Sequence, residues 1–259
     1  MTVALQTREA GAGPVLVLMH GLFGSSRNWV AIQKTLAEHF HVVSLDLRNH
    51  GVSPWDDQMD YDVMAEDVGA LIRERGWESV YLLGHSMGGK VAMTLALREP
   101  QRVARLIVAD IAPVVYAPHY SDYIEAMVAL DLNQISRRSD ADRQLAAAIP
   151  EPGVRAFLLQ NLVQEQGVWS WRINLAALQQ SLVALGEFPV GAERLSTDCP
   201  ALFIRGSASD YVLDDSLPII KAFFPRTEVH TIAGAGHWLH AEKPAEFVAR
   251  VEQFLEPGA

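Results

Sequence analysis

The sequence predicts an α/β fold in which a mostly parallel sheet is flanked by helices and a helical cap is inserted between two strands. Short apolar segments alternate along the chain with longer amphipathic segments, as in parallel strands joined by helical crossovers. The apolar segments are continuous, so we expect strands that are buried on both faces. Between 113 and 198 strand-like segments become scarce and helical periodicity dominates, which indicates the cap.

Six segments have the composition of buried strands, and the first of them, 14–19, runs directly into a glycine-punctuated loop at 20–26. A second polar loop follows the next strand, at 46–55. Polar loops at strand ends are where α/β sheets place their ligands. The expected strands are 14–19, 41–46, 79–83, 105–110, 201–205 and 228–232.

Helical segments follow most of these strands. Residues 61–75 place Met64, Val68 and Leu71 on one face, which is the spacing of a helix that packs against a sheet. Pro244 stands in the first turn of the last helix, where proline is tolerated. The other expected helices are 29–39, a segment from the 84–89 turn to about Arg98, and 154–163 and 175–185 within the cap.

These elements divide the chain into a core of 1–112 and 199–259 and a cap of 113–198. The cap follows a core strand, so we expect it to cover the carboxyl ends of the strands and to shape a substrate pocket there. The length of 259 residues suits one large domain, or one domain with an insertion.

Composition narrows the range of partners. The chain is 49% hydrophobic and 20% charged, as in ordinary globular enzymes, and its net charge is −10. Without a basic stripe to neutralise phosphates, a nucleic-acid partner and docking on an anionic membrane are both disfavoured. No apolar run approaches the roughly 20 residues that span a bilayer. We therefore expect a small-molecule substrate as the partner, and the sequence indicates no oligomeric state.

The cysteine content and the first residues bear on the cellular location of the protein. The single cysteine, Cys199, excludes an intrachain disulfide and a thiolate zinc cluster. The first residues lack the basic and apolar regions of a signal peptide, so we expect a cytoplasmic protein. Acidic residues at 56, 57 and 60 have no accompanying His or Asn ligands, so no metal site is expected there.

The strongest motif is Gly-His-Ser-Met-Gly at 84–88, which fits G-x-S-x-G between a strand and a helix. A sharp turn of this kind needs glycines where neighbouring backbone passes closely. Ser86 would stand at the helix N-terminus, where the dipole favours developing negative charge. The alternative is a glycine-rich turn whose serine only caps the helix. The flanking strand and helix favour Ser86 as a nucleophile.

Acyl transfer also needs donors for the oxyanion. The Met87 amide would supply one, and we expect Leu22, in the loop after the first strand, to supply the second, with Phe23 as the alternative. His20 is predicted to fix this loop by hydrogen bonding and not to carry protons. The alternative for this segment is a plain turn between strand and helix, which the G-x-S-x-G motif disfavours.

Nine histidines compete for the role of general base. His237 follows the last strand in a glycine-rich loop and is the last triad member in the chain order Ser, Asp, His, so it is the predicted base. His240 is expected to face the surface or cap the next helix. Two aspartates are candidates for the acid. Asp210 follows the penultimate strand but stands one residue beyond Ser209, where the usual spacing would place the acid. Asp110 ends the strand after the helix that begins at the 84–89 turn, and it is favoured over Asp210.

Together these residues resemble the α/β-hydrolase superfamily, and more narrowly small bacterial esterases and thioesterases related to mitochondrial abhydrolase-domain proteins. The resemblance covers nearly the whole chain and implies an α/β-hydrolase fold with a mostly parallel eight-stranded sheet. It also implies that the aspartate of Asp-Ile-Ala-Pro is the acid, which supports Asp110 over Asp210. The matching segments are 20–25, 46–53, 84–90, 110–113, 171–175 and 234–238.

Further residues are candidates for substrate contact. Their alternative role is that of buried packing residues, which is the default for aromatic side chains. For the loop at 46–53, packing is the favoured interpretation over substrate contact. The candidates are Phe23, His85, Trp238, Tyr116 and Trp171.

The sequence thus predicts a serine hydrolase that cleaves esters or thioesters of short-to-medium acyl chains through an acyl-enzyme, with no cofactor or metal. One alternative is a carbon–carbon bond hydrolase or lyase on the same triad, for which Arg48, Arg172 and Lys90 are the available cations. Another is a non-enzymatic ligand receptor. Epoxide hydrolases and haloalkane dehalogenases place an aspartate where Ser86 stands, so they are disfavoured.

Overall fold

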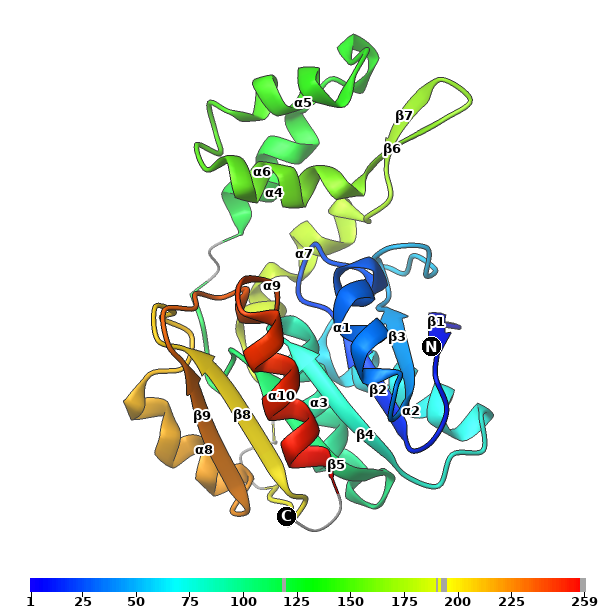
Figure 1. Ribbon diagram of the computed structural model, residues 1–259. Helices are drawn as coiled ribbons and strands as arrows, with labels where there is room; N and C mark the ends of the chain where they lie inside the picture. Colours follow the sequence, from blue (N-terminus) through cyan, green and yellow to red (C-terminus); the bar gives the residue numbers. More distant parts are fainter. Residues whose placement is uncertain (118–119, 190, 192–194, 257–259) are drawn as a thin grey trace.

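A computed structural model describes residues 1–256 except 118–119, 190 and 192–194. Its main sheet has the order β1-β3-β2-β4-β5-β8-β9 (Figure 1). All neighbouring strands run parallel except β1, which pairs antiparallel with β3. The strands are β1 (Gln6–Ala10), β2 (Val15–Met19), β3 (His41–Asp46), β4 (Val80–His85), β5 (Val103–Ala109), β8 (Ala201–Gly206) and β9 (Thr227–Ile232).

The expected fold class and parallel sheet are confirmed, but the strand count of eight is wrong for the described residues, where the sheet has seven strands. The sheet ends at β1 on one side and at β9 on the other, so no described strand pairs with either outer edge. The sequence of β1, Gln-Thr-Arg-Glu-Ala, is polar, and charged side chains on an edge strand oppose pairing with a further strand. This polarity also explains why β1 lacks the apolar signal of the six expected strands.

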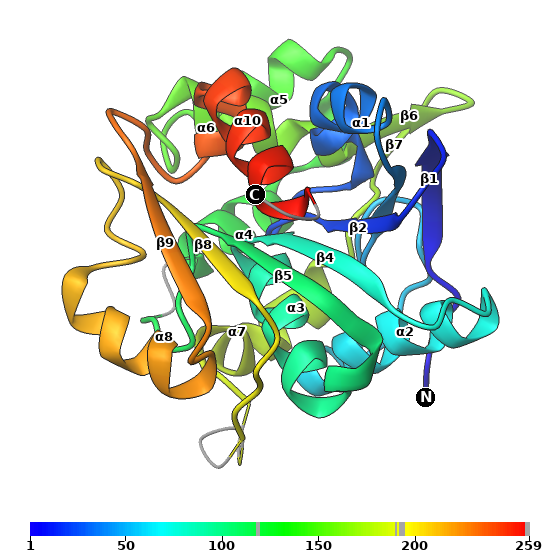
Figure 2. The same ribbon diagram turned by 60° about the horizontal axis from the view of Figure 1, so that its bottom comes forward.

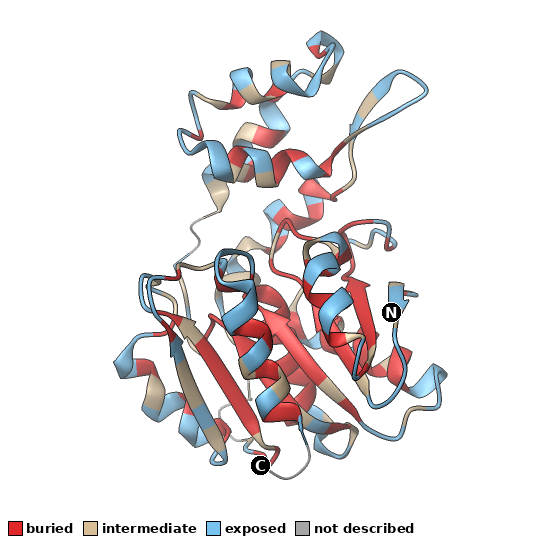
Figure 3. Cartoon of the chain, viewed as in Figure 1, coloured by how far each residue is buried: buried red, intermediate tan, exposed pale blue. Residues whose placement is uncertain are grey.

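Helices cover both faces of the sheet (Figures 1 and 2). One face packs against α1 (Val30–Leu36) and α10 (Pro244–Leu255). The other face packs against α2 (Tyr61–Glu74), α3 (Met87–Arg98) and α8 (Leu217–Phe223). The central strands are buried from both sides, whereas the helices expose their outer faces (Figure 3).

The described part of the chain between β5 and β8 lies mostly beyond the carboxyl ends of the strands (Figure 1). It contains α4 (Ser121–Ala129), α5 (Arg138–Leu145), α6 (Pro152–Leu158), α7 (Leu175–Gly186) and a hairpin of β6 (Leu162–Glu165) and β7 (Val168–Trp171). We call α4 to α7, with the hairpin, the cap segment.

One expected helix of the cap segment is shorter than predicted. The segment 154–163 was expected to be helical throughout, but α6 ends at Leu158 and β6 begins at Leu162. The reason is the turn Gln166-Gly167, whose φ angles of 50° and 85° fit the two-residue turns that join antiparallel strands. Within the described residues, no helix is long and apolar enough to cross a membrane.

Candidate active site

Ser86 stands between the end of β4 and the start of α3, in a strained backbone conformation with φ 51° and ψ −118°. The flanking glycines are required by close backbone contacts. A Cβ on Gly84 would lie 2.1 Å from the Gly88 carbonyl oxygen, and a Cβ on Gly88 would lie 2.5 Å from the Met19 carbonyl oxygen. Any other residue at these two positions would open the turn that presents the Ser86 hydroxyl.

His237 lies between Ser86 and Asp110. Its Nε2 is 3.0 Å from Ser86 Oγ, and its Nδ1 is 2.8 Å from Asp110 Oδ2. The buried Asp110 carboxylate can accept hydrogen bonds but cannot donate them, so Nδ1 of His237 must carry the proton between them. Nε2 is then unprotonated and can accept the Ser86 proton. The structure therefore brings together the predicted nucleophile, the predicted base and one of the two candidate acids.

The strand register explains why Asp110 reaches His237. Strands β4 and β5 are neighbours, and His85 pairs with Ala109, so the residues that follow them, Ser86 and Asp110, leave the sheet side by side. Asp110 also has a positive φ of 53°. Asp210, the alternative acid, is exposed on the loop after β8, and among the described residues it makes no contact with His237.

Two groups from the β8 side hold the Asp110 carboxylate. The Gly206 amide donates to Oδ1 at 3.0 Å, and the Ser209 hydroxyl donates to Oδ2. Ser209 occupies the position where the usual spacing would place an acid. Ser209 thus contacts Asp110, the acid that follows the neighbouring strand β5. Sequence reasoning missed this role of Ser209. The only signal for it was that position 209 is a serine where an acid is usual.

The loop after β2 is fixed by two neutral histidines. Both imidazoles use one ring nitrogen as a donor and the other as an acceptor: His20 contacts the Gly21 carbonyl at 2.8 Å and accepts from the Leu47 amide, and His50 accepts from the Phe23 amide at 3.3 Å. Burial lowers the pKa of both histidines, that of His50 to about 3, which keeps them in this form. His20 therefore has the contacts expected of a residue that fixes the loop.

These contacts distinguish the two candidate amides of the oxyanion loop. The Phe23 amide is already engaged by His50, whereas the Leu22 amide has no hydrogen-bond partner among the described residues. Leu22 and Met87 also line one cavity together with Ser86. The geometry accordingly favours Leu22 over Phe23 as the second donor.

A second histidine pair lies behind His237. His85 Nε2 is 2.8 Å from the His237 carbonyl oxygen, and the His85 ring packs against the His240 ring at 4.5 Å between centroids. The expectation that His240 faces the surface or caps a helix is wrong, because its side chain packs on Trp29 and is 6% exposed. Burial lowers the pKa of His240 to about 3, and that of His85 falls well below 6.5 for the same reason.

Two cavities meet at Ser86. The narrow compartment, of about 40 Å³, is lined by core residues and α7 and contains the predicted contact Tyr116. The wide compartment, of about 530 Å³, extends under α6 and contains the predicted contacts Phe23, His85 and Trp238 as well as His237. Trp171 lines neither compartment: its indole donates to the Met127 carbonyl at 3.2 Å within the cap segment, so it is not a substrate contact in this structure.

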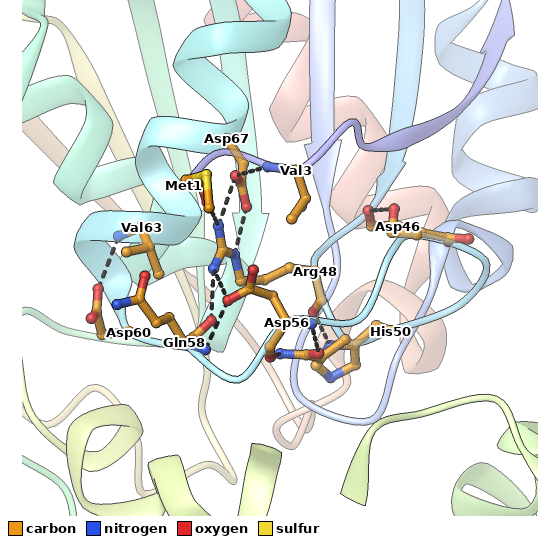
Figure 4. Close-up of polar contacts among 12 residues, drawn as sticks. Met1, Val3, Asp46, Arg48, His50, Asp56, Gln58, Asp60, Val63 and Asp67 are labelled. Carbon is orange, nitrogen blue, oxygen red and sulfur yellow. Dashed lines mark hydrogen bonds and ion pairs between the residues drawn. The ribbon is translucent and has the colours of Figure 1, made fainter. Parts of the chain in front are cut away.

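The loop at 46–53 has the packing role that the sequence favoured. Figure 4 shows the Arg48 guanidinium pointing at the Asp67 carboxylate of α2, with Nε 2.7 Å from Oδ2. Arg48 also donates to the Gln58 and Met1 carbonyls and is fully buried. Arg48 is thus committed to the fold, which removes one of the three cations that a carbon–carbon bond hydrolase could use.

The described part of the chain contains no group of three or more His, Cys, Asp or Glu side chains suited to a metal ion. Cys199 is buried, and burial raises the pKa of its thiol to about 11. What the arrangement offers is a hydroxyl, an imidazole and a carboxylate in one hydrogen-bonded row beside two amides.

Known proteins and a solved structure are similar to this chain over most of its length. A family model described as alpha/beta hydrolase fold matches residues 14–244. The chain is 43% identical over 252 residues to the sn-1-specific diacylglycerol lipase ABHD11 of Xenopus tropicalis, covering 94% of this chain and 78% of that protein. It is 37% identical over 246 residues to the esterase YbfF of Escherichia coli (strain K12), covering 93% and 92%. A solved marine microorganism esterase matches with a TM-score of 0.94 and 38% identity, over 98% of this chain and 100% of that one.

Proposed function

The chain belongs to the α/β-hydrolase family and is a carboxylic ester hydrolase, and we propose that it forms an acyl-enzyme on Ser86 from esters or thioesters of short-to-medium acyl chains. The observation that carries this proposal is the position of His237, within hydrogen-bond distance of both Ser86 Oγ and Asp110 Oδ2. A hydroxyl is a weak nucleophile until a base of this kind takes its proton.

In the first half of the reaction, His237 Nε2 takes the Ser86 proton as Oγ attacks the acyl carbonyl carbon. The amides of Met87 and Leu22 stabilise the oxyanion, and each such donor lowers the barrier by roughly 3 kcal/mol. His237 then gives its proton to the departing oxygen or sulfur, which leaves the acyl group on Ser86. Asp110 holds the imidazole in the required tautomer and stabilises its protonated form.

In the second half, water replaces the leaving group. His237 takes a proton from the water as the water oxygen attacks the acyl-enzyme carbonyl, and it returns that proton to Ser86 as the carboxylic acid leaves. The strained φ of Ser86 supports this cycle because it presents Ser86 to both compartments at the helix N-terminus.

The test is hydrolysis of p-nitrophenyl esters with acyl chains of two to sixteen carbons. We expect turnover of short and medium esters by the wild type, and a loss of kcat on the order of 10⁶ in Ser86→Ala. A matched control is Ser139→Ala, because Ser139 is exposed in α5 and far from the reacting atoms. Turnover by Ser86→Ala at the wild-type rate would refute the proposal, as would a wild type that hydrolyses no ester of the series.

A further inference from the structure

Under the proposed mechanism, the two compartments at Ser86 bind different parts of the substrate. His237 lines the wide compartment and is not among the described residues that line the narrow one. Since His237 must protonate the leaving group, that group has to lie in the wide compartment. The acyl group then extends from Ser86 into the narrow compartment, past Met87 toward Lys90.

Lys90 closes the narrow compartment with a buried cation. It follows Ser86 by one turn of α3, and its side chain is 1% exposed. Nζ donates to the carbonyls of Gly186 at 3.0 Å and Glu187 at 2.6 Å, at the C-terminal end of α7. An ammonium group has three N–H donors, so one of them is not used by these two carbonyls.

The two tyrosine hydroxyls next to Lys90 are already engaged. The Tyr61 hydroxyl donates to the Leu185 carbonyl at 2.7 Å, and the Tyr116 hydroxyl donates to the Tyr211 carbonyl. The rings of Tyr61 and Tyr116 face Nζ at 5.3 Å and 4.8 Å. Among Lys90, Tyr61 and Tyr116, the third N–H of Lys90 is therefore the donor that remains for a ligand in the compartment.

Arg48 shows what a buried cation normally has in this protein. Arg48 and Lys90 are the two charged residues among the largest fully buried side chains of the described chain. Arg48 forms an ion pair with Asp67 at 2.7 Å (Figure 4), whereas no carboxylate of the described residues lies within ion-pair distance of Lys90. A buried charge without an anion is costly, so the position beside Nζ is suited to a counter-charge from outside the chain.

Resting on the proposed function, we propose that the narrow compartment selects acyl groups that end in a carboxylate, which pairs with Lys90. The substrates of this class are monoesters or monothioesters of short dicarboxylic acids. Their ester carbonyl lies at Ser86, their apolar or bulky leaving group lies in the wide compartment, and their free carboxylate lies at Nζ. Lys90 is then a specificity-determining residue.

The experiment compares two methyl esters of equal length. Monomethyl glutarate has an acyl chain that ends in a carboxylate, and methyl 5-methylhexanoate ends in an isopropyl group of the same shape without charge. We expect a higher kcat/KM for monomethyl glutarate in the wild type. Lys90→Met should lower the ratio of the kcat/KM for monomethyl glutarate to that for the neutral ester by about 10- to 100-fold, the strength of a charge-assisted hydrogen bond.

The matched control is Lys221→Met, which removes an exposed lysine from α8 and should change neither value. If the wild type prefers the neutral ester, or if Lys90→Met leaves the ratio of the two values unchanged, the inference is overturned while the hydrolase proposal stands. If Ser86→Ala hydrolyses both methyl esters at the wild-type rate, the proposed function itself fails.

A second measurement needs no substitution, so it holds even if Lys90→Met does not fold. Burial lowers the pKa of Lys90 from 10.5 to about 7, against the opposing effect of Glu187. The fraction of charged Lys90 in the free enzyme thus falls between pH 6.5 and 8.5, and kcat/KM reports the free enzyme. We expect the ratio of monomethyl glutarate to neutral ester to fall over this range. A constant or rising ratio would contradict the inference, because a purely structural lysine would not change the ratio.

Discussion

The phenol ring of Tyr211 stacks on the imidazole of His237, with 3.8 Å between the ring centroids and 17° between the planes. Tyr211 belongs to the loop after β8, and its amide contacts Ser209 Oγ at 3.3 Å. The stack fixes the plane of the imidazole, and Asp110 fixes its rotation within that plane through Nδ1. The proposed base is thus held by two neighbours on different elements.

Replacement of Tyr211 should therefore reduce turnover without removing a reacting group. For Tyr211→Leu we expect kcat on p-nitrophenyl acetate to fall about 3- to 10-fold, the range of energy that an aromatic pair contributes. Tyr211→Phe keeps the ring and serves as the control, so its kcat should stay near the wild-type value. Equal losses in both variants would contradict a role for the stack.

The identity of the acid is tested by two aspartate substitutions. Asp110→Asn should lower kcat on the order of 10⁴-fold, because an amide no longer holds the required tautomer of His237. Asp210→Asn should stay within about threefold of wild type, as expected of an exposed side chain. Steady-state kinetics on one ester decides between them, and a larger loss in Asp210→Asn would reverse the assignment.

Ser209 is expected to act through Asp110. Its hydroxyl donates to the carboxylate oxygen that also contacts His237, so Ser209→Ala frees that oxygen to move. We expect kcat to fall by about tenfold, since hydrogen bonds to charged groups contribute about 1.5–3 kcal/mol, of which only part acts on the imidazole. Ser209→Thr retains the hydroxyl and should recover most of the activity. If Ser209→Ala is fully active, Gly206 alone holds the acid.

The buried pair of Arg48 and Asp67 should matter for stability. Arg48→Met leaves Asp67 buried without its cation, and we expect the free energy of unfolding to fall by about 3–5 kcal/mol in urea titrations. Arg73→Met is the control: it removes ion pairs at a partly exposed site and should cost about 1 kcal/mol or less. The double variant Arg48→Met with Asp67→Asn removes the uncompensated charge, so it should be more stable than Arg48→Met alone.

Stability should also fall in mild acid. The pKa of both His50 and His240 is lowered by burial to about 3 in the folded protein. The unfolded chain binds protons at these imidazoles below about pH 6.5, so the free energy of unfolding decreases from there toward pH 3, by at most about 1.4 kcal/mol per pH unit for each histidine. This loss is absent above pH 6.5.

Urea titrations at several values between pH 7 and pH 5 measure this slope. His240→Phe keeps an aromatic ring against Trp29 and should make the slope shallower by up to about 1 kcal/mol per pH unit. His39→Gln replaces an exposed histidine and should leave the slope unchanged. An unchanged slope in His240→Phe would show that His240 does not contribute.

Much of the fold was predictable because buried parallel strands carry a strong apolar signal. The segments at 14–19 and 201–205 coincide closely with β2 and β8. Elements without that signal were not found: β1 is polar, and most residues of the β6–β7 hairpin are exposed or half-buried. The cap boundaries at 113–198 and the cytoplasmic location stay predictions.

The candidate site was predictable where chemistry and chain order coincide, as at Ser86 and His237. The spacing favoured Asp110 without excluding Asp210, since the choice depends on which strand lies beside β4. Ser209 contacts Asp110, about 100 residues away in the chain, and Tyr211 contacts His237, about 25 residues away. No local sequence pattern indicates contacts over such separations. The burial of His240 likewise depends on Trp29 from a distant helix.

The register between β4 and β5 has a consequence for the recovery of this protein from denaturant. Ser86 and Asp110 become neighbours only when His85 is paired with Ala109, so a slip of one residue between the two strands would separate them. Helix content measured by circular dichroism would hardly change after such a slip. Enzyme activity therefore reports the fraction of molecules in which β4 and β5 pair in the native register. It is a more stringent assay of correct refolding than any signal from the helices.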